Sequence, residues 1–273
     1  MQGRLLPPVE NRIQSFPKDR WAEEFSLAAL LGIQTIEWIY EDYGSKENPI
    51  ATDVGIMRLK ELSSQYGIKV LSLCADYFMD YPLLRCSVIQ QRERIAKLEW
   101  LLERAQQAAI ASVVLPFVDH SNIKNEEEIK ETISLLQEVL PFAERYQVEL
   151  HLETDLEPHL FSSLLHRLPH PLLKVNYDSG NSASLGYSIS EEFKAYGERI
   201  GSVHIKDRLR GGGTVPLGQG DVSFAELAAA LQRIDYQRPL ILQIARGVSG
   251  SEVDWVRENI KTVKTIFKKT DHS

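Results

Sequence analysis

Cysteine is scarce in this chain, because only Cys74 and Cys86 occur among its 273 residues. Two thiols cannot form the disulfide framework of a small secreted domain, and they fit a reducing cytoplasm. Long apolar runs are also missing: the opening residues, MQGRLLPP, contain neither a signal-peptide core nor a membrane span. We therefore expect a cytoplasmic protein that has no membrane partner.

An excess of basic residues is likewise absent, since the formal net charge is −7 at pH 7. This balance argues against a nucleic-acid partner, which a basic surface would attract. The length suits one large domain of barrel size as well as two small ones. No linker or low-complexity insert divides the chain, so we expect one domain that covers residues 1–273.

Residues 200–207, IGSVHIKD, alternate apolar and polar side chains and therefore predict a β-strand. Similar segments at 147–153, 173–178 and 239–243 each end in a side chain that can bind a metal. The four polar residues that mark these strands are Glu153, Asp178, His204 and Gln243. They recur one strand-plus-helix unit apart, which places them at one mouth of a parallel barrel.

Strand and helix patterns alternate along the whole chain. Predicted strands cover residues 2–6, 35–40, 69–74, 112–117, 147–153, 173–178, 200–207 and 239–243. Predicted helices cover residues 21–31, 53–66, 87–109, 126–146, 157–166, 190–196, 223–234 and 251–267. Such alternation predicts a parallel sheet, and eight units in about 250 residues predict an α/β fold of the (β/α)8 TIM-barrel type. A doubly wound open sheet is the alternative.

The predicted mouth offers two carboxylates, an imidazole and an amide oxygen, and no sulfur. This donor set favours Mn²⁺ or Mg²⁺ as cofactor, with Zn²⁺ or Co²⁺ as alternatives. Each residue also has an ordinary explanation, such as a hydrogen-bonded core histidine or an aspartate that caps a helix. Four such residues at consecutive strand ends are much harder to explain by chance.

Several motifs carry a resemblance to a known family. They are MQGRL at 1–5, IEW at 36–38, HLET at 151–154, VNYDSGN at 175–181, VHIKD at 203–207 and LGQGDV at 217–222. Over nearly its whole length the chain resembles the sugar phosphate isomerase/epimerase family of xylose isomerase-like TIM barrels. The resemblance implies a small sugar or sugar phosphate as substrate. It also implies a divalent metal held by Glu153, Asp178, His204 and the residue at position 243.

Position 243 departs from the family pattern, in which two glutamates move a proton on opposite faces of the substrate. Gln243 can offer an oxygen to a metal, but it cannot act as a base, and it removes one negative charge. The remaining options are a one-base isomerase or dehydratase that uses Glu153, an enzyme with another second acid/base, or an inactive relative. Candidates for the second role are Lys206, Asp207, Glu37 and His151.

Removing a proton beside a carbonyl leaves an enediolate, which a chelated cation stabilises. We expect Glu153 to be the base and Lys206 either to neutralise an enediolate oxygen or to extend toward solvent. Predicted substrate contacts are Glu37, His151, Asp207, Arg208 and Arg246. The glycine-rich stretch 208–221 fits a mobile lid better than a phosphate cradle, because no Walker-type spacing is present.

Three functions stay open: a metal-dependent enzyme acting on a small sugar, a metal-poor binding protein, and an abasic-site endonuclease. The second is motivated by Gln243. The third requires additional histidines and a basic surface, which the sequence does not offer. A homo-oligomer is also open, because barrels with an exposed helical face commonly pair.

Overall fold

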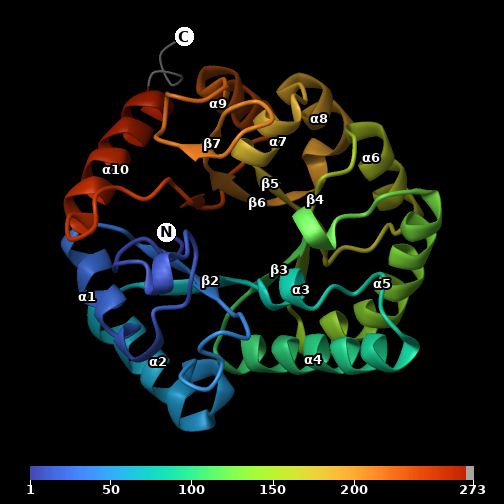
Figure 1. The fold of residues 1–273 in the computed structure, drawn as a ribbon, viewed down its shortest axis with the longest axis horizontal. Coiled ribbons are helices and arrows are strands. Elements are labelled where there is room, and N and C mark those ends of the chain that lie inside the picture. The colour runs from blue at the N-terminus through green and yellow to red at the C-terminus, as the bar shows by residue number, and fades with distance from the viewer. Residues whose placement is uncertain (269–273) are drawn as a thin grey trace.

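The computed structural model describes residues 1–268, which form an α/β barrel with strands inside and helices outside (Figure 1). Seven parallel strands are hydrogen-bonded in the order β1-β2-β3-β4-β5-β6-β9. They are β1 (Thr35–Ile39), β2 (Lys69–Cys74), β3 (Ser112–Phe117), β4 (Glu149–Thr154), β5 (Leu173–Asp178), β6 (Ile200–Ile205) and β9 (Leu240–Leu242). The parallel barrel is confirmed, and seven of its eight predicted strands are present.

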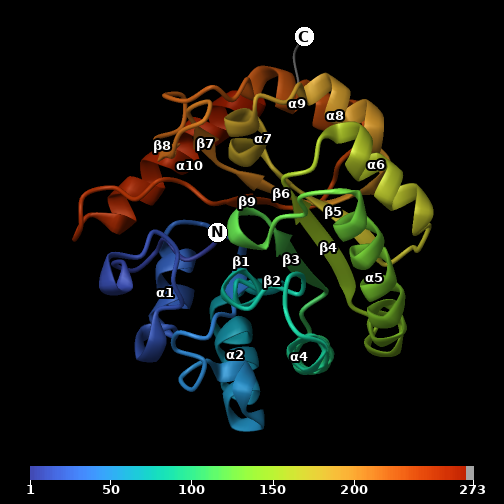
Figure 2. The same cartoon turned by 45° about the vertical axis from the view of Figure 1, so that its right-hand side comes forward.

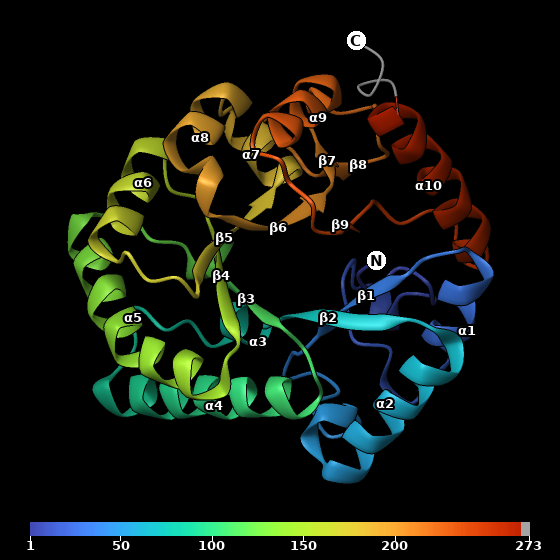
Figure 3. The same ribbon diagram turned by 180° about the vertical axis from the view of Figure 1, so that it is seen from behind.

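The predicted strand at residues 2–6 is wrong as a strand. Gly3 has a φ of 55°, a left-handed conformation that interrupts extended backbone. The segment still lies between β9 and β1 (Figure 3), because the Gln2 N–H donates to Leu242 O at 3.1 Å and the Glu37 N–H to Met1 O at 2.9 Å. An irregular segment thus fills the place of the eighth strand.

The outer helices agree with the predicted ones apart from shifts of their ends. They are α1 (Glu23–Leu30), α2 (Asp53–Tyr66), α4 (Val88–Gln107), α5 (Glu126–Tyr146), α6 (Pro158–Arg167), α8 (Ile189–Tyr196), α9 (Phe224–Arg233) and α10 (Glu252–Lys268). Capping residues in the sequence determine where several of these helices begin and end. Thr52 accepts a hydrogen bond from the Gly55 N–H at the start of α2, and Gly67 ends that helix with a φ of 67°.

Four short elements at the mouth of the barrel were not predicted. Helix α3 (Tyr77–Asp80) follows β2, and helix α7 (Ser179–Leu185) follows β5. Asp178 starts α7 by accepting a hydrogen bond from the Asn181 N–H at 2.8 Å. Strands β7 (Asp207–Arg208) and β8 (Thr214–Val215) form an antiparallel hairpin that packs near α7 (Figure 2). The glycine-rich stretch is therefore partly ordered by pairing.

The apolar core lies between the sheet and the helices, whereas the inside of the barrel is polar. Trp38 and Leu115 belong to the core, while the buried polar side chains include Glu37, His151 and His204. Most buried polar groups in proteins are paired, and these three side chains are hydrogen-bonded within the barrel. Among residues 1–268, none of the helices has the length and apolar character needed to cross a membrane.

Candidate metal centre and active site

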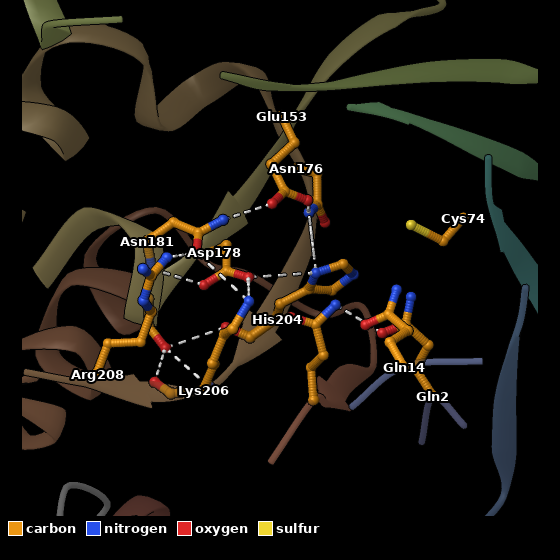
Figure 4. A network of polar contacts seen from close by, with 12 residues as sticks. Gln2, Gln14, Cys74, Glu153, Asn176, Asp178, Asn181, His204, Lys206 and Arg208 are labelled. Atoms are coloured by element: carbon orange, nitrogen blue, oxygen red, sulfur yellow. Dashed lines mark hydrogen bonds and ion pairs between the residues drawn. The ribbon is translucent and has the colours of Figure 1, made fainter. Parts of the chain in front are cut away.

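Three predicted metal ligands meet at the mouth of the barrel. Potential ligand atoms of Glu153, Asp178 and His204 all lie within 4.8 Å of one another, and all three residues are buried. His204 Nδ1 lies 3.6 Å from Glu153 Oε2 and 3.7 Å from Asp178 Oδ2 (Figure 4). Asp178 and His204 are also direct neighbours in the register of β5 and β6. We call these three residues the candidate metal centre.

Gln243 lies just after β9 and lines the same pocket as Glu153. Its Nε2 donates to Oε1 of Gln2 at 2.6 Å. Its own Oε1 is buried and has no hydrogen-bond partner among residues 1–268. A buried acceptor without a donor is costly unless a cation or another donor satisfies it. Two carboxylates, an imidazole and this amide oxygen therefore fit a divalent cation.

The ring of His204 is held from behind by Glu37. His204 Nε2 lies 2.8 Å from Glu37 Oε1, and Ser72 donates to the other carboxylate oxygen at 2.7 Å. This is the carboxylate–histidine pairing that orients metal-binding imidazoles. Burial lowers the pKa of His204, but Glu37 and Asp178 raise it to about 10. Glu37, predicted to contact substrate, lies behind the histidine and supports it.

Glu153 is fixed by two amides. Its Oε2 accepts a hydrogen bond from Asn176 Nδ2 and its Oε1 from Asn181 Nδ2, each at 2.7 Å. Burial and the neighbouring charge of Asp178 raise the pKa of Glu153 to about 7. A carboxylate with such a pKa can take up and release a proton near neutral pH.

Lys206 extends from the end of β6 toward Asp178, and its Nζ lies 3.2 Å from Asp178 Oδ2. Burial alone would raise the pKa of Asp178, but Lys206 and His204 lower it, so this carboxylate stays ionised. The stem of Lys206 passes over Gly180, where a Cβ would lie 2.7 Å from Lys206 Cγ. The ammonium group is thus directed into the site and is only partly exposed.

Asn181 links most of the site and was not recognised from the sequence as a functional residue. Its Nδ2 donates to Glu153, while its Oδ1 accepts from Arg208 Nη1 at 2.8 Å and from Lys206 Nζ at 3.4 Å. The DSGN motif at 178–181 is the sequence signal that could have indicated it. Helix α7 turns this side chain inward, so that it lies between Glu153 and the positively charged side chains of Lys206 and Arg208.

A cavity of about 460 Å³ opens next to the candidate metal centre. One wall carries Lys206 and Arg208, and another carries Cys74, Asp76 and Gln14. Figure 4 shows Cys74 and Gln14 on the opposite side of the centre from Arg208. The cavity has room for a small sugar, with cationic groups on one side and an acid on the other.

His151 lies deeper in the barrel than Glu153 and is 1% exposed. Its Nδ1 lies 2.7 Å from Ser202 Oγ, and its Nε2 lies 2.9 Å from Glu149 Oε2. Both ring nitrogens are therefore occupied within the protein. The predicted role of His151 as a substrate contact has no geometric support.

Asp207 and Arg246 hold loops together. The carboxylate of Asp207 accepts hydrogen bonds from the backbone N–H groups of Gly218, Gly220 and Val222. The guanidinium of Arg246 donates to the backbone carbonyls of Gly3, Leu6 and Ile13. Of the five predicted substrate contacts, Arg208 is the one that both lines the cavity and reaches the network around Glu153.

The protein is a parallel α/β barrel with two carboxylates and an imidazole gathered at its mouth. Comparison with known proteins identifies its family. A family model described as "Xylose isomerase-like TIM barrel" matches residues 25–266, and the chain belongs to this family. A candidate L-ribulose-5-phosphate 3-epimerase of Haemophilus influenzae is 22% identical over 249 residues, which cover 85% of this chain and 86% of that protein.

Solved structures agree on the fold. An L-ribulose 3-epimerase superposes with a TM-score of 0.79 at 13% identity, covering 98% of this chain and 94% of that one. The IOLI protein with a bound zinc atom superposes with a TM-score of 0.76 at 19% identity, covering 90% of this chain and 92% of that one. Two of these three proteins, the Haemophilus influenzae relative and the L-ribulose 3-epimerase, carry the name of a sugar epimerase.

Proposed function

We propose that this protein is a divalent-metal-dependent isomerase or epimerase that acts on a small sugar or sugar phosphate through an enediolate. The observation that carries the proposal is the convergence of Glu153, Asp178 and His204 beside a cavity of about 460 Å³. Sugar epimerases among the relatives support the substrate class. Glu153, Asp178, His204 and Gln243 would hold the metal.

A divalent cation, when bound, stabilises negative charge on substrate oxygens and orients the substrate. Glu153 is the proposed base, because its pKa of about 7 lets it remove a proton from the carbon beside the carbonyl. Asn176 and Asn181 hold its carboxylate in one orientation. Lys206 stabilises the developing oxyanion, and Arg208 contacts the hydroxyl or phosphate end of the substrate.

The donor set favours Mn²⁺ or Mg²⁺, because carboxylate and amide oxygens outnumber nitrogen and no sulfur contributes. Zn²⁺ and Co²⁺ remain alternatives, and a structural neighbour carries zinc. A second candidate function, a binding protein without catalysis, rests on Gln243, which cannot replace the second catalytic glutamate of the family.

Deuterium exchange tests the proposal. Protein reconstituted with Mn²⁺ is incubated in D₂O with a panel of ketoses and ketose phosphates, and loss of the C–H signal beside the carbonyl is followed by NMR. We expect exchange in the wild type and its loss in Glu153→Gln. Glu191→Gln, an exposed substitution on α8, is the matched control and should exchange normally. A wild type that binds sugar without exchange would favour the binding protein.

A further inference from the structure

The site contains a carboxyl group that the proposed chemistry has not yet used. Asp76 follows β2 at the mouth of the barrel and lines the same cavity as Glu153. An aspartate at the first turn of a helix usually caps it, yet within the described part of the chain Asp76 makes no side-chain capping bond to α3. Its carboxylate is therefore directed elsewhere.

Both oxygens of Asp76 are positioned by side chains of the cavity wall. The thiol of Cys74 donates to Oδ1 at 3.1 Å, and Gln14 Nε2 donates to Oδ2 at 2.5 Å. Figure 4 shows Cys74 and Gln14 on the opposite side of the candidate metal centre from Asn181 and Arg208, and Asp76 is hydrogen-bonded to both Cys74 and Gln14. It approaches the cavity from β2, whereas Glu153 approaches from β4.

Other acids of the cavity are less suited to act on a substrate at the centre. Glu41 accepts the Phe16 N–H at 2.5 Å and pairs with Arg12 at 3.5 Å, so it holds the N-terminal region in place. Asp80 and Asp119 are exposed. Asp76 is half-buried and lines the cavity together with Glu153.

We infer that Asp76 is the second acid/base of the reaction and replaces the glutamate that is missing at position 243. This inference rests on the proposed function. Glu153 removes the proton from the carbon beside the carbonyl, and the electron pair moves onto the carbonyl oxygen to give the enediolate. Protonated Asp76 then gives its proton to the same carbon from the other wall of the cavity. Both carboxyl groups regain their starting states by exchange with water.

The surroundings of Asp76 suit this role. Burial raises its pKa above that of an ordinary aspartate, although the hydrogen bonds from Cys74 and Gln14 lower it. A larger fraction of the carboxyl group is then protonated and able to donate than in water. In the reverse direction the ionised form accepts the proton, so one residue serves both directions.

Asp76→Asn separates the two halves of the reaction. In D₂O this variant should still exchange the C–H of the epimer on which Glu153 acts, because Glu153 is intact. Formation of the other epimer should fall at least about 100-fold. With that other epimer as substrate, exchange and conversion should both fall by a similar factor.

Two further variants keep the test decisive. Asp76→Glu keeps a carboxyl group and should restore part of the epimer formation, which a purely structural role would not explain. Asp42→Asn, an exposed change in a neighbouring loop, should leave both reactions unaltered. Normal Mn²⁺ binding by Asp76→Asn checks that the variant is folded.

The outcomes are distinguishable. If the wild type exchanges and Asp76→Asn forms the epimer at the wild-type rate, Asp76 is not the second acid/base. Equal loss of exchange from both epimers in Asp76→Asn would also overturn the inference. If the wild type exchanges no sugar at all, the proposed function itself fails, and the inference fails with it.

Discussion

The carboxamides of Gln2 and Gln243 meet across 2.6 Å, with the amide N–H of Gln243 donating to the carbonyl of Gln2. This bond uses the nitrogen of Gln243, whereas its oxygen has no hydrogen-bond partner within residues 1–268. The amide oxygen of Gln243 is therefore the atom that this side chain can offer to a cation. The irregular N-terminal segment thus contributes to the site even though it is not a strand.

Gln243→Glu should tighten binding of Mn²⁺, because a carboxylate adds one negative charge to the ligand set. We expect roughly tenfold higher affinity, equivalent to about 1.4 kcal/mol, measured by competition with a chromophoric chelator. Gln232→Glu, on the exposed surface of α9, controls for the change in net charge. Unchanged affinity in Gln243→Glu would place residue 243 outside the coordination sphere.

Glu37→Gln should weaken metal binding without removing a ligand. The carboxylate of Glu37 holds the His204 ring at 2.8 Å, and loss of such a supporting partner typically costs about 10–100-fold in metal affinity. Ser72→Ala removes only the hydrogen bond to the far oxygen of Glu37, so it should have a smaller effect. The same chelator competition measures both, and equal effects would contradict this ordering.

Stability should depend on pH through Glu149. Burial raises the pKa of this carboxyl, but Arg238 and His151 lower it from 4.5 to about 2. A lowered folded-state pKa means that the pair stabilises the protein above pH 4.5 and loses this contribution as the pH falls toward 2. Glu149→Gln should therefore reduce the free energy of unfolding by roughly 2 kcal/mol at pH 7, allowing for solvent screening at Arg238.

Urea unfolding of the wild type and Glu149→Gln at pH 7, 5, 4 and 3 measures this dependence. The difference between the two proteins should shrink steadily below pH 5. A difference that stays constant down to pH 3 would show that the ionised carboxylate does not contribute.

Gly220→Ala should release the glycine-rich loop. A Cβ at this position would lie 2.1 Å from Asp207 Oδ1, so the hydrogen bonds that the loop N–H groups donate to Asp207 cannot all persist. We expect faster proteolytic cleavage within residues 208–221 and a stability loss of about 1–3 kcal/mol. Gly213→Ala is the matched control, because nothing lies within 4 Å of its Cβ position. Equal cleavage rates in the two variants would show that the hydrogen bonds to Asp207 do not hold the loop in place.

Periodicity predicted the barrel and the three residues of the candidate metal centre because both depend on short-range patterns. Glu153, Asp178 and His204 mark strand ends that the sequence shows directly, and parallel strands bring such ends together. The left-handed conformation of Gly3 could not be predicted, because it leaves the pattern of apolar residues in its segment unchanged. Its effect is visible only once the backbone is built.

Side chains whose partners come from distant loops could not be assigned from the sequence. Asp207 and Arg246 looked like substrate contacts, yet they bind backbone groups of loops whose course no local pattern specifies. Asn181 and Asp76 were missed for a related reason. Their neighbours Lys206, Arg208 and Gln14 come from other parts of the chain.

A continuous chain of buried hydrogen bonds connects the two ends of this barrel. Arg238 binds Glu149, which contacts His151, and His151 connects through Ser202 and Asn176 to Glu153. Each member limits the orientation of the next, so the rim opposite the mouth helps to set the direction in which the proposed base points. An enzyme engineered on this scaffold would need to keep that internal column intact, however far its lower end lies from the substrate.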